Sequence, residues 1–396
     1  MKELSVIAEN VQASTTLAMD ALYKEMKAAG VDVIGFAAGE PDFPTPDYIK
    51  YAGIEAIVNN ATKYTPATGT MELKKAVCYR LKEDLDLDYE PANIVVTSGA
   101  KHCLYVALRA IINPGDEVII PVPAWVSYNE MVKMVGGLPV YVHCDEDKDF
   151  KMTPAQLEAA ITDKTKCIML NNPSNPTGML YEREELEALA EVCVKHDIFI
   201  MADEIYYKLL YDGKTFTSVA SLGDKVKELT IIINGVSKSY AMTGWRIGYI
   251  AADARVTSVI AKYLSHSTGN PSAPAQAAAV AALTAPQDTA EEMRKAFEER
   301  RNYMVERMNQ IPGISCLKPE GAFYVMMNIT KLIGKTIHGK MILNADDFGD
   351  VFLKDGLVCL VPCTGFGDPY FLRWSYATSM ENIKEGLDRL EKFLEG

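Results

Sequence analysis

Short β-branched runs alternate with longer helical patterns through the middle of this 396-residue chain. The helical stretches carry apolar residues at three- and four-residue spacing, as in residues 186–196. This alternation favours a mostly parallel sheet with helices on both faces. We therefore expect an α/β fold with a large domain built on seven strands, at residues 93–97, 117–120, 140–143, 167–171, 198–202, 230–234 and 247–251.

The two ends of the chain follow a different pattern. We expect an amphipathic helix at 14–29, a short strand at 33–36 and a long charged helix at 286–310. Further strands are expected at 323–328, 357–361 and 370–374, before a closing helix that starts at Met380. Strands and helices mixed in this way predict a small α+β domain built from both termini, residues 1–44 and 291–396, beside a large domain at 45–290.

Composition limits the classes of function. A formal net charge of −13 makes nucleic acid and anionic membranes poor partners. The start of the chain lacks a signal-peptide pattern, and no run approaches the roughly 18–20 apolar residues of a membrane span. The eight cysteines form no Cys-x-x-Cys pair and the five histidines show no ligand spacing. These features predict a cytoplasmic enzyme with free thiols and no structural metal.

Polar residues follow four of the expected strands. Ligand sites form at the carboxyl ends of parallel strands and at domain junctions, so we expect these residues to meet. They are Gly99, Ala100 and Lys101 after the first strand, Asn175 in a proline-rich turn after the fourth, Asp203 and Tyr206 after the fifth, and Ser237, Lys238 and Ser239 after the sixth.

The chemistry of these residues fits one cofactor, pyridoxal 5′-phosphate. Partial burial can keep the amine of Lys238 neutral, and a neutral amine condenses with an aldehyde. A buried carboxylate such as Asp203 can keep a pyridine nitrogen protonated, as an electron sink requires. Backbone amides at the helix start at Gly99 bind phosphate well, and Arg246, eight residues after Lys238, is the candidate for an additional contact to the phosphate.

Eight motifs give the chain a wider resemblance. They are residues 38–43 (AGEPDF), 64–69 (YTPATG), 123–125 (PAW), 175–178 (NPTG), 203–206 (DEIY), 237–248 (SKSYAMTGWRIG), 321–324 (GAFY) and 373–377 (RWSYA). In these motifs, over essentially its whole length, the chain resembles the class I aminotransferases of the fold-type I pyridoxal-phosphate enzymes. It is most similar to the bacterial aspartate aminotransferase subgroup. The block around Lys238 is the most specific.

The resemblance implies a role for each cofactor residue. Lys238 would bind the cofactor covalently and then move a proton between the substrate α-carbon and the cofactor C4′. Asp203 would pair with the pyridine nitrogen, Tyr206 and Asn175 with the phenolic oxygen, and Trp125 would stack on the ring. The phosphate would be bound by Arg246, a nearby serine and the helix start formed by Gly99, Ala100 and Lys101.

The resemblance also implies residues for the substrate and for a second subunit. Arg373 would bind the substrate α-carboxylate, with help from Asn175 and the backbone of Gly39. Tyr64 would reach the phosphate in a neighbouring subunit, which implies a homodimer with shared active sites. Many relatives have a phosphate-binding serine three residues before the lysine, where this chain has Gly235. Whether Ser237 or Ser239 replaces that serine stays open.

The substrate depends on a few residues only. In the bacterial subgroup a lysine at the position of Lys101 serves a distal carboxylate, together with hydroxyls such as those of residues 14–16. This implies ping-pong transamination of aspartate or glutamate with 2-oxoglutarate or oxaloacetate. Alternatively, Lys101 is an exposed helix residue that contributes only its amide. Relatives that use prephenate tend to carry an arginine at the position of Gln12, so we expect weak prephenate activity.

Three other functions stay open from the sequence. An aminotransferase for aromatic amino acids or alanine would share every core residue. A β-lyase would use the same lysine and carboxylate but release pyruvate and ammonia without a 2-oxo acid acceptor. A non-enzymatic sensor module of a transcription regulator would carry an added DNA-binding domain, for which we expect no room because the first fold helix starts within about ten residues of Met1.

Overall fold

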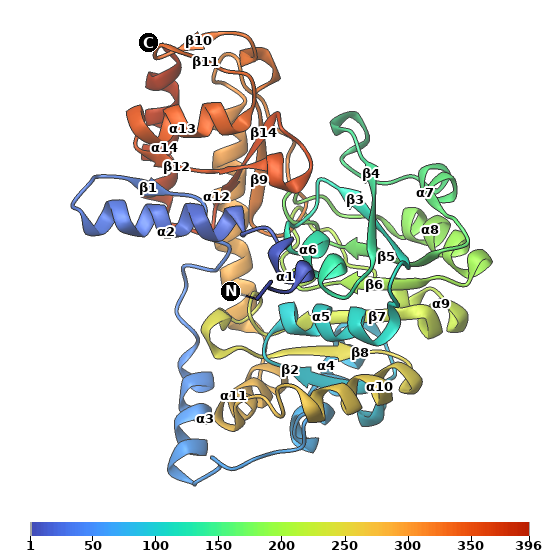
Figure 1. Cartoon of the computed structure of the whole chain (residues 1–396). Helices are drawn as coiled ribbons and strands as arrows, with labels where there is room; N and C mark the ends of the chain where they lie inside the picture. Colours follow the sequence, from blue (N-terminus) through green and yellow to red (C-terminus); the bar gives the residue numbers. More distant parts are fainter. Residues whose placement is uncertain (1, 396) are drawn as a thin grey trace.

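A computed structural model describes residues 2–395 of the chain. Its centre is a seven-stranded sheet in the order β2-β8-β7-β6-β5-β3-β4, seen at the right of Figure 1. Neighbouring strands from β7 to β4 run parallel, whereas β8 runs antiparallel to both of its neighbours. The strands are β2 Ile94–Thr97, β3 Glu117–Val122, β4 Leu138–His143, β5 Thr165–Asn171, β6 Phe199–Asp203, β7 Thr230–Gly235 and β8 Gly248–Ala251.

Helices cover both faces of this sheet because the strands are apolar on both sides. Alternate strand residues such as Met169, Met201 and Ile233 pack with α5 and α10 on one face. Ile168 and Ile200 pack toward α8 on the other. The helices of this part are α3 Asp47–Val58, α4 Met71–Leu85, α5 Ala100–Ile111, α6 Ser127–Met134, α7 Pro154–Ala160, α8 Arg183–His196, α9 Asp224–Leu229, α10 Ala254–His266 and α11 Ala273–Thr284.

The two ends of the chain come together in a second layered region, the red, orange and dark-blue part of Figure 1. β9, β13 and β14 form an antiparallel sheet, while β1 pairs in parallel with β12. β10 and β11 form a hairpin. The elements are α2 Thr15–Ala28, β1 Ile34–Gly35, β9 Tyr324–Asn328, β10 Thr336–Ile337, β11 Lys340–Met341, α13 Ala345–Asp355, β12 Val358–Cys359, β13 Val361–Pro362, β14 Phe371–Ser375 and α14 Met380–Glu395.

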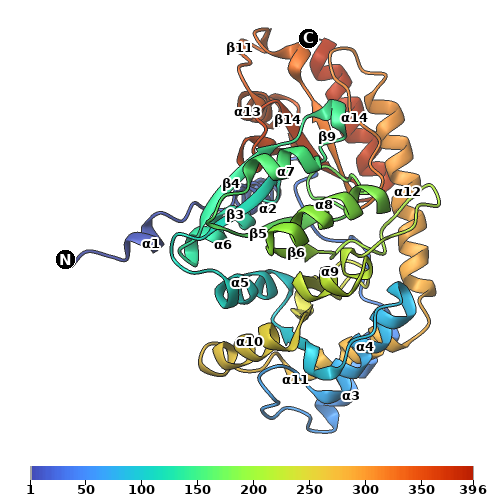
Figure 2. The ribbon, with the colours of Figure 1, turned by 90° about the vertical axis from the view of Figure 1, so that its right-hand side faces the viewer.

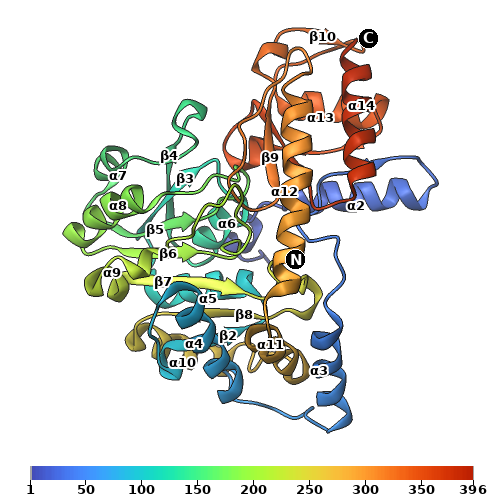
Figure 3. The same cartoon turned by 180° about the vertical axis from the view of Figure 1, so that it is seen from behind.

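Two further helices complete the chain. The long helix α12, Asp288–Met308, runs alongside both regions (Figure 3). The short helix α1, Val6–Glu9, projects away from the body of the molecule (Figure 2). Within residues 2–395, every helix is too short or too polar to span a bilayer.

The structure confirms the predicted fold class and all seven central strands, with shifts of one to two residues at their ends. One terminal strand was predicted wrongly: residues 357–361 do not form a single strand. β12 pairs with β1, while β13 pairs with β14, so the chain changes sheets at the buried Leu360. The division into domains at residues 45 and 290 stays a prediction.

Candidate active site

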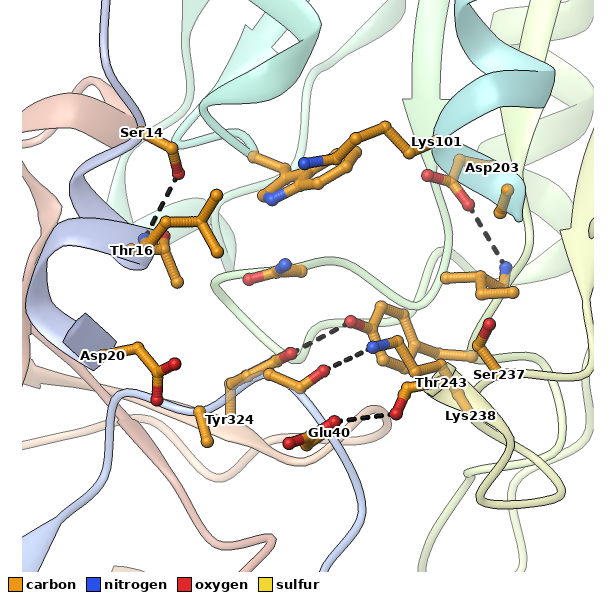
Figure 4. Close-up of a pocket in the computed structure, with 18 of the residues that line it drawn as sticks. Ser14, Thr16, Asp20, Glu40, Lys101, Asp203, Ser237, Lys238, Thr243 and Tyr324 are labelled. Carbon is orange, nitrogen blue, oxygen red and sulfur yellow. Dashed lines mark hydrogen bonds between the residues drawn. The ribbon is translucent and has the colours of Figure 1, made fainter. Parts of the chain in front are cut away.

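A cavity of about 450 Å³ lies where the carboxyl ends of the parallel strands face the terminal region (Figure 4). Ser14, which caps α2, lies on one side of it with Thr16 and Asp20 of α2, and Asp203 and Lys238 lie opposite. Eleven predicted site residues line this cavity: Gly39, Ala100, Lys101, Trp125, Asn175, Asp203, Tyr206, Ser237, Lys238, Arg246 and Arg373. The strand ends therefore converge as the sequence predicted.

Asp203 ends β6 and is 4% exposed. Its Oδ2 accepts a hydrogen bond of 2.6 Å from the Tyr128 hydroxyl, and its Oδ1 accepts one from the Ile205 amide. Burial raises the pKa of Asp203 to about 6, although the bond from Tyr128 lowers it. The carboxylate is therefore mostly ionised at neutral pH and is held in one orientation. Tyr128 was not predicted from the sequence.

Lys238 lies in the loop that follows β7 and is partly buried. Its Nζ donates a hydrogen bond to the backbone oxygen of Gly39 and lies 5.8 Å from the centre of the Phe323 ring. Burial lowers the pKa of Lys238 to about 8, against the attraction of Glu40, which raises it. A substantial fraction of the amine is therefore neutral near physiological pH.

The start of α5 and Arg246 form a compact corner. Gly99 precedes α5 with φ +91°, and a Cβ at Gly99 would lie 2.2 Å from Nη2 of Arg246. Only glycine fits this backbone and this close approach. Arg246 donates from Nη1 to the backbone oxygen of Thr243 at 2.7 Å and from Nη2 to that of Ser98 at 3.3 Å. The corner thus combines a guanidinium with the amides of a helix start, an arrangement that attracts anions.

The contact between β7 and β8 explains the glycine at position 235. A Cβ at Gly235 would lie 2.8 Å from the backbone oxygen of Ile247 and 3.0 Å from Cα of Gly248. A serine at this position would require the paired strand to shift. Ser237 lines the cavity, whereas the Oγ of Ser239 is buried and has no hydrogen-bond partner within residues 2–395.

Arg373 on β14 is 1% exposed, and its guanidinium is held on several sides. Nη1 donates to Oδ1 of Asn175 at 2.9 Å, and Nη2 donates to the backbone oxygen of Ala37 at 2.8 Å. The guanidinium carbon lies 4.3 Å from the centre of the Tyr324 ring. Among residues 2–395 Arg373 forms no ion pair, and its Nε has no hydrogen-bond partner. A buried cation left in this state can bind a carboxylate.

The hydroxyls of Tyr206 and Tyr324 form a hydrogen bond of 3.0 Å in the same cavity. Burial raises the pKa of both phenols above the ordinary value, so both stay protonated at neutral pH. Tyr324 belongs to the GAFY motif, but no role was predicted for it. Its position in a recognised motif at the start of β9 is the signal that could have singled it out.

Lys101 also lines the cavity. Its Nζ is 4.8 Å from the centre of the Trp125 ring, and burial together with Arg246 lowers its pKa. Ser14 and Thr16 face the cavity, but Thr15 does not line it. Gln12 lies outside the cavity, where its backbone amide donates to Glu130 at 2.9 Å.

Tyr64 is the predicted residue that the single chain does not bring to the site. It is fully exposed and does not line the cavity. Glu204, which the sequence left without a role, is buried and accepts a 2.6 Å hydrogen bond from Ser218. Burial raises the pKa of Glu204 to about 8. All eight cysteines are free thiols, and seven of them are buried.

Comparisons with known proteins agree with this geometry. The family model described as aminotransferase class I and II matches residues 31–390. An aspartate aminotransferase of Bacillus subtilis (strain 168) is 50% identical over 382 residues, which is 96% of each chain. An asparagine–oxo-acid transaminase of Streptococcus mutans is 44% identical over the full length of both chains. The crystal structure of an aspartate aminotransferase from Rhizobium meliloti, 40% identical, superposes with a TM-score of 0.96 and covers 100% of this chain and 99% of its own.

The chain therefore belongs to the class I and II aminotransferases. This confirms the resemblance found in the sequence. The protein is an enzyme whose cofactor is pyridoxal 5′-phosphate and whose substrates are amino acids and 2-oxo acids.

Proposed function

We propose that this enzyme transfers the amino group of aspartate or glutamate to 2-oxoglutarate or oxaloacetate in a ping-pong reaction at Lys238. The observation that carries the proposal is a pair of cations in one cavity. Arg373 is suited to an α-carboxylate, and Lys101 lines the same cavity beside Trp125. Two cations in one cavity match a substrate with two carboxylates.

The residues that line the cavity fit pyridoxal 5′-phosphate. A Cβ at Gly99 would fill the space between the start of α5 and Arg246, which leaves a tight corner suited to the phosphate. Ser237 is our choice for the additional hydroxyl, because it lines the cavity and Ser239 does not. Asn175 and Tyr206 would bind the phenolic oxygen, and Trp125 would cover one face of the ring. When bound, the cofactor supplies an electron sink for the substrate α-carbon.

The protein residues divide the remaining work between them. Asp203 keeps its negative charge because Tyr128 donates to it, and this charge favours a proton on the pyridine nitrogen. Lys238 attaches the cofactor and then acts as the base that moves the α-proton. Arg373 orients the substrate by binding its α-carboxylate. Asn175 holds the guanidinium of Arg373, and Gly39 lines the same cavity. Positioning by preformed groups of this kind lowers the barrier without any movement at the moment of reaction.

The relatives make asparagine a second candidate donor, since one full-length relative is named an asparagine–oxo-acid transaminase. Lys101 favours aspartate, because an ammonium binds a distal carboxylate more strongly than a neutral amide. The same argument disfavours alanine and aromatic amino acids. Gln12 provides no cation for the larger prephenate, so we propose weak activity with it.

The test is product analysis with a panel of amino donors, with and without 2-oxoglutarate. We expect glutamate to form several-fold faster with aspartate as donor than with asparagine, alanine or phenylalanine. The same difference is expected for the amino acid that corresponds to prephenate. The panel includes cystathionine, because its thiolate can leave from Cβ; formation of pyruvate and ammonia from it without an acceptor would replace the proposal by a β-lyase. A faster reaction with a neutral donor would keep the transamination and discard the preference for dicarboxylates.

We also propose a homodimer in which Tyr64 reaches the phosphate corner of the partner subunit. Two features support it. Tyr64 is fully exposed, and α3 turns a stripe of exposed apolar side chains outward, namely Tyr51, Ile54, Ile57 and Val58. Exposed apolar surface of this kind marks interaction sites. Mixed dimers of Lys238→Ala and Tyr64→Phe subunits would contain one site with neither substitution, so mixing should restore activity that neither homodimer has in full.

We propose that the enzyme acts in the cytoplasm, because free, buried thiols suit a reducing compartment.

We also propose that residues 1–44 and 291–396 act as a small domain that closes over the substrate, against the large domain at 45–290. The cavity lies between α2 and the sheet ends, which is where such closure would exclude water.

A further inference from the structure

Residues 37–40 form a short segment that runs between Arg373 and Lys238. The backbone oxygen of Ala37 accepts from Arg373, and that of Gly39 accepts from Nζ of Lys238. The segment belongs to no helix or strand. Its carbonyl groups are therefore placed by contacts with side chains.

Glu40 provides one such contact. Its Oε2 accepts a hydrogen bond of 2.7 Å from Oγ1 of Thr243, which Figure 4 draws beside the amine of Lys238. Thr243 begins a 3₁₀ turn, Thr243–Trp245, in the loop that carries Lys238. The backbone oxygen of Thr243 accepts from Arg246 at 2.7 Å. The Glu40 carboxylate thus links the segment directly to the lysine loop.

We propose that Glu40 is a positioning residue whose hydrogen bond to Thr243 holds the Gly39 carbonyl against the free amine of Lys238. The inference deepens the proposed function, and it rests on Lys238 acting as the base. A base transfers a proton efficiently only when its nitrogen is directed at the reacting atom. The Gly39 carbonyl gives the flexible lysine side chain a fixed partner, and Glu40 fixes that carbonyl in turn.

The charge of Glu40 has a second effect, which can be separated from the first. Burial is the largest influence on the pKa of Lys238 and lowers it to about 8. Of the charged groups facing the amine, Glu40 from the segment and Asp203 from β6 raise this pKa, while Arg373 from β14 and Arg246 from the lysine loop lower it. Removing the charge of Glu40 should therefore lower the pKa of Lys238 further.

Three variants separate the hydrogen bond from the charge. Glu40→Gln keeps an oxygen that can accept from Thr243 but removes the charge. Thr243→Val keeps the charge but removes the donor, and Thr243→Ser restores the donor. Asp42→Asn is the matched control, because Asp42 is a carboxylate on the same stretch that pairs with Arg300 at 2.7 Å and does not contact Lys238.

The first measurement uses cofactor-free protein. The rate at which an amine-reactive reagent modifies Lys238 is followed across pH by peptide mass spectrometry. We expect Glu40→Gln to lower the pKa of Lys238, and Asp42→Asn to leave it at the wild-type value. This readout does not depend on transamination, so it remains valid if the proposed function fails.

The second measurement is steady-state kinetics with aspartate on cofactor-loaded enzyme. We expect Thr243→Val to lower kcat about 10-fold, the scale of a small misplacement of a reacting group, with KM within about 2-fold of wild type. Thr243→Ser should recover most of the loss. The proposal is overturned by a wild-type kcat in Thr243→Val, or by a rise in KM that accounts for the whole effect. An unchanged Lys238 pKa in Glu40→Gln would refute the separate effect of the charge. If the wild-type enzyme carried no cofactor on Lys238, the proposed function itself would be refuted.

Discussion

The two walls of the active-site cavity are built differently. The wall at the strand ends carries Asp203 and Asn175, both less than 10% exposed and each held by a hydrogen bond, from Tyr128 and from Arg373 respectively. The opposite wall is α2, a helix with no fully buried residue. Rigid, satisfied groups suit the chemistry that every amino acid shares. An exposed helix can move, and we propose that it faces, together with Lys101 from α5, the end of the substrate that differs from one amino acid to the next.

The largest effect is expected on the rigid wall, at Lys238. Lys238→Ala should lower kcat on the order of 10⁴-fold, because it removes both the attachment of the cofactor and the base. The absorbance of lysine-bound cofactor should disappear with it. Retention of this absorbance in Lys238→Ala would mean that the cofactor is attached elsewhere. A wild-type kcat in Lys238→Ala would contradict the assignment of the shared chemistry to the wall at the strand ends.

Arg373→Lys should have the next largest effect. A lysine cannot reproduce the contacts to Asn175 and Ala37 while binding a carboxylate, and it is buried in a space shaped for a planar group. We expect kcat/KM to fall about 30- to 1000-fold for every donor, through a loss of about 2–4 kcal/mol. Arg307→Lys on α12, an exposed ion pair, is the control and should be neutral. A loss confined to dicarboxylates would contradict a general role in binding the α-carboxylate.

Lys101→Gln, at the start of α5, tests the group proposed to bind the distal carboxylate. It keeps the backbone amide, so retention of the cofactor should be unchanged. The ratio of kcat/KM for aspartate to that for alanine should fall about 10- to 100-fold, because one charge-assisted bond to the distal carboxylate is lost. An unchanged ratio would reduce Lys101 to its backbone amide. The measurement is a comparison of donors at saturating 2-oxoglutarate.

Tyr128→Phe should have the smallest effect, a few-fold at neutral pH. The Tyr128 hydroxyl stabilises the ionised form of Asp203 and so lowers its pKa, which burial holds at about 6. Without this bond the pKa of Asp203 rises, and the carboxylate loses its charge at a higher pH. The acid limb of the kcat profile should therefore move toward neutral pH. An acid limb in its wild-type position would show that Asp203 is not the group that titrates there.

The order of these residues along the chain explains how much could be predicted. The strands are short apolar runs, and the residues that follow them are fixed by the topology, so Asp203, Lys238 and Asn175 were predicted at one sheet edge. Two pairings between distant segments were not predicted. Tyr128 contacts Asp203 across 75 residues, and Glu40 contacts Thr243 across 203. Nothing local in the sequence marks such a pair.

Two further details needed three-dimensional contacts. The glycine at position 235 looked like a missing serine, but the approach of β8 leaves no room for a side chain. Residues 357–361 look like one strand because they are uniformly apolar. Their division between two sheets depends on the partners β1 and β14, which come from opposite ends of the chain. Apolar patterns predict that a segment is buried, but they do not identify its partner.

The most direct test of the account is a spectral titration of cofactor-loaded enzyme with single amino acids and no 2-oxo acid acceptor. The absorbance of the Lys238-bound cofactor should be lost with aspartate and with glutamate at low concentrations. With alanine, asparagine and phenylalanine it should persist until much higher concentrations are reached. Equal loss with neutral donors would contradict the role of the two cations. An absorbance that no amino acid changes would contradict transamination at Lys238 itself.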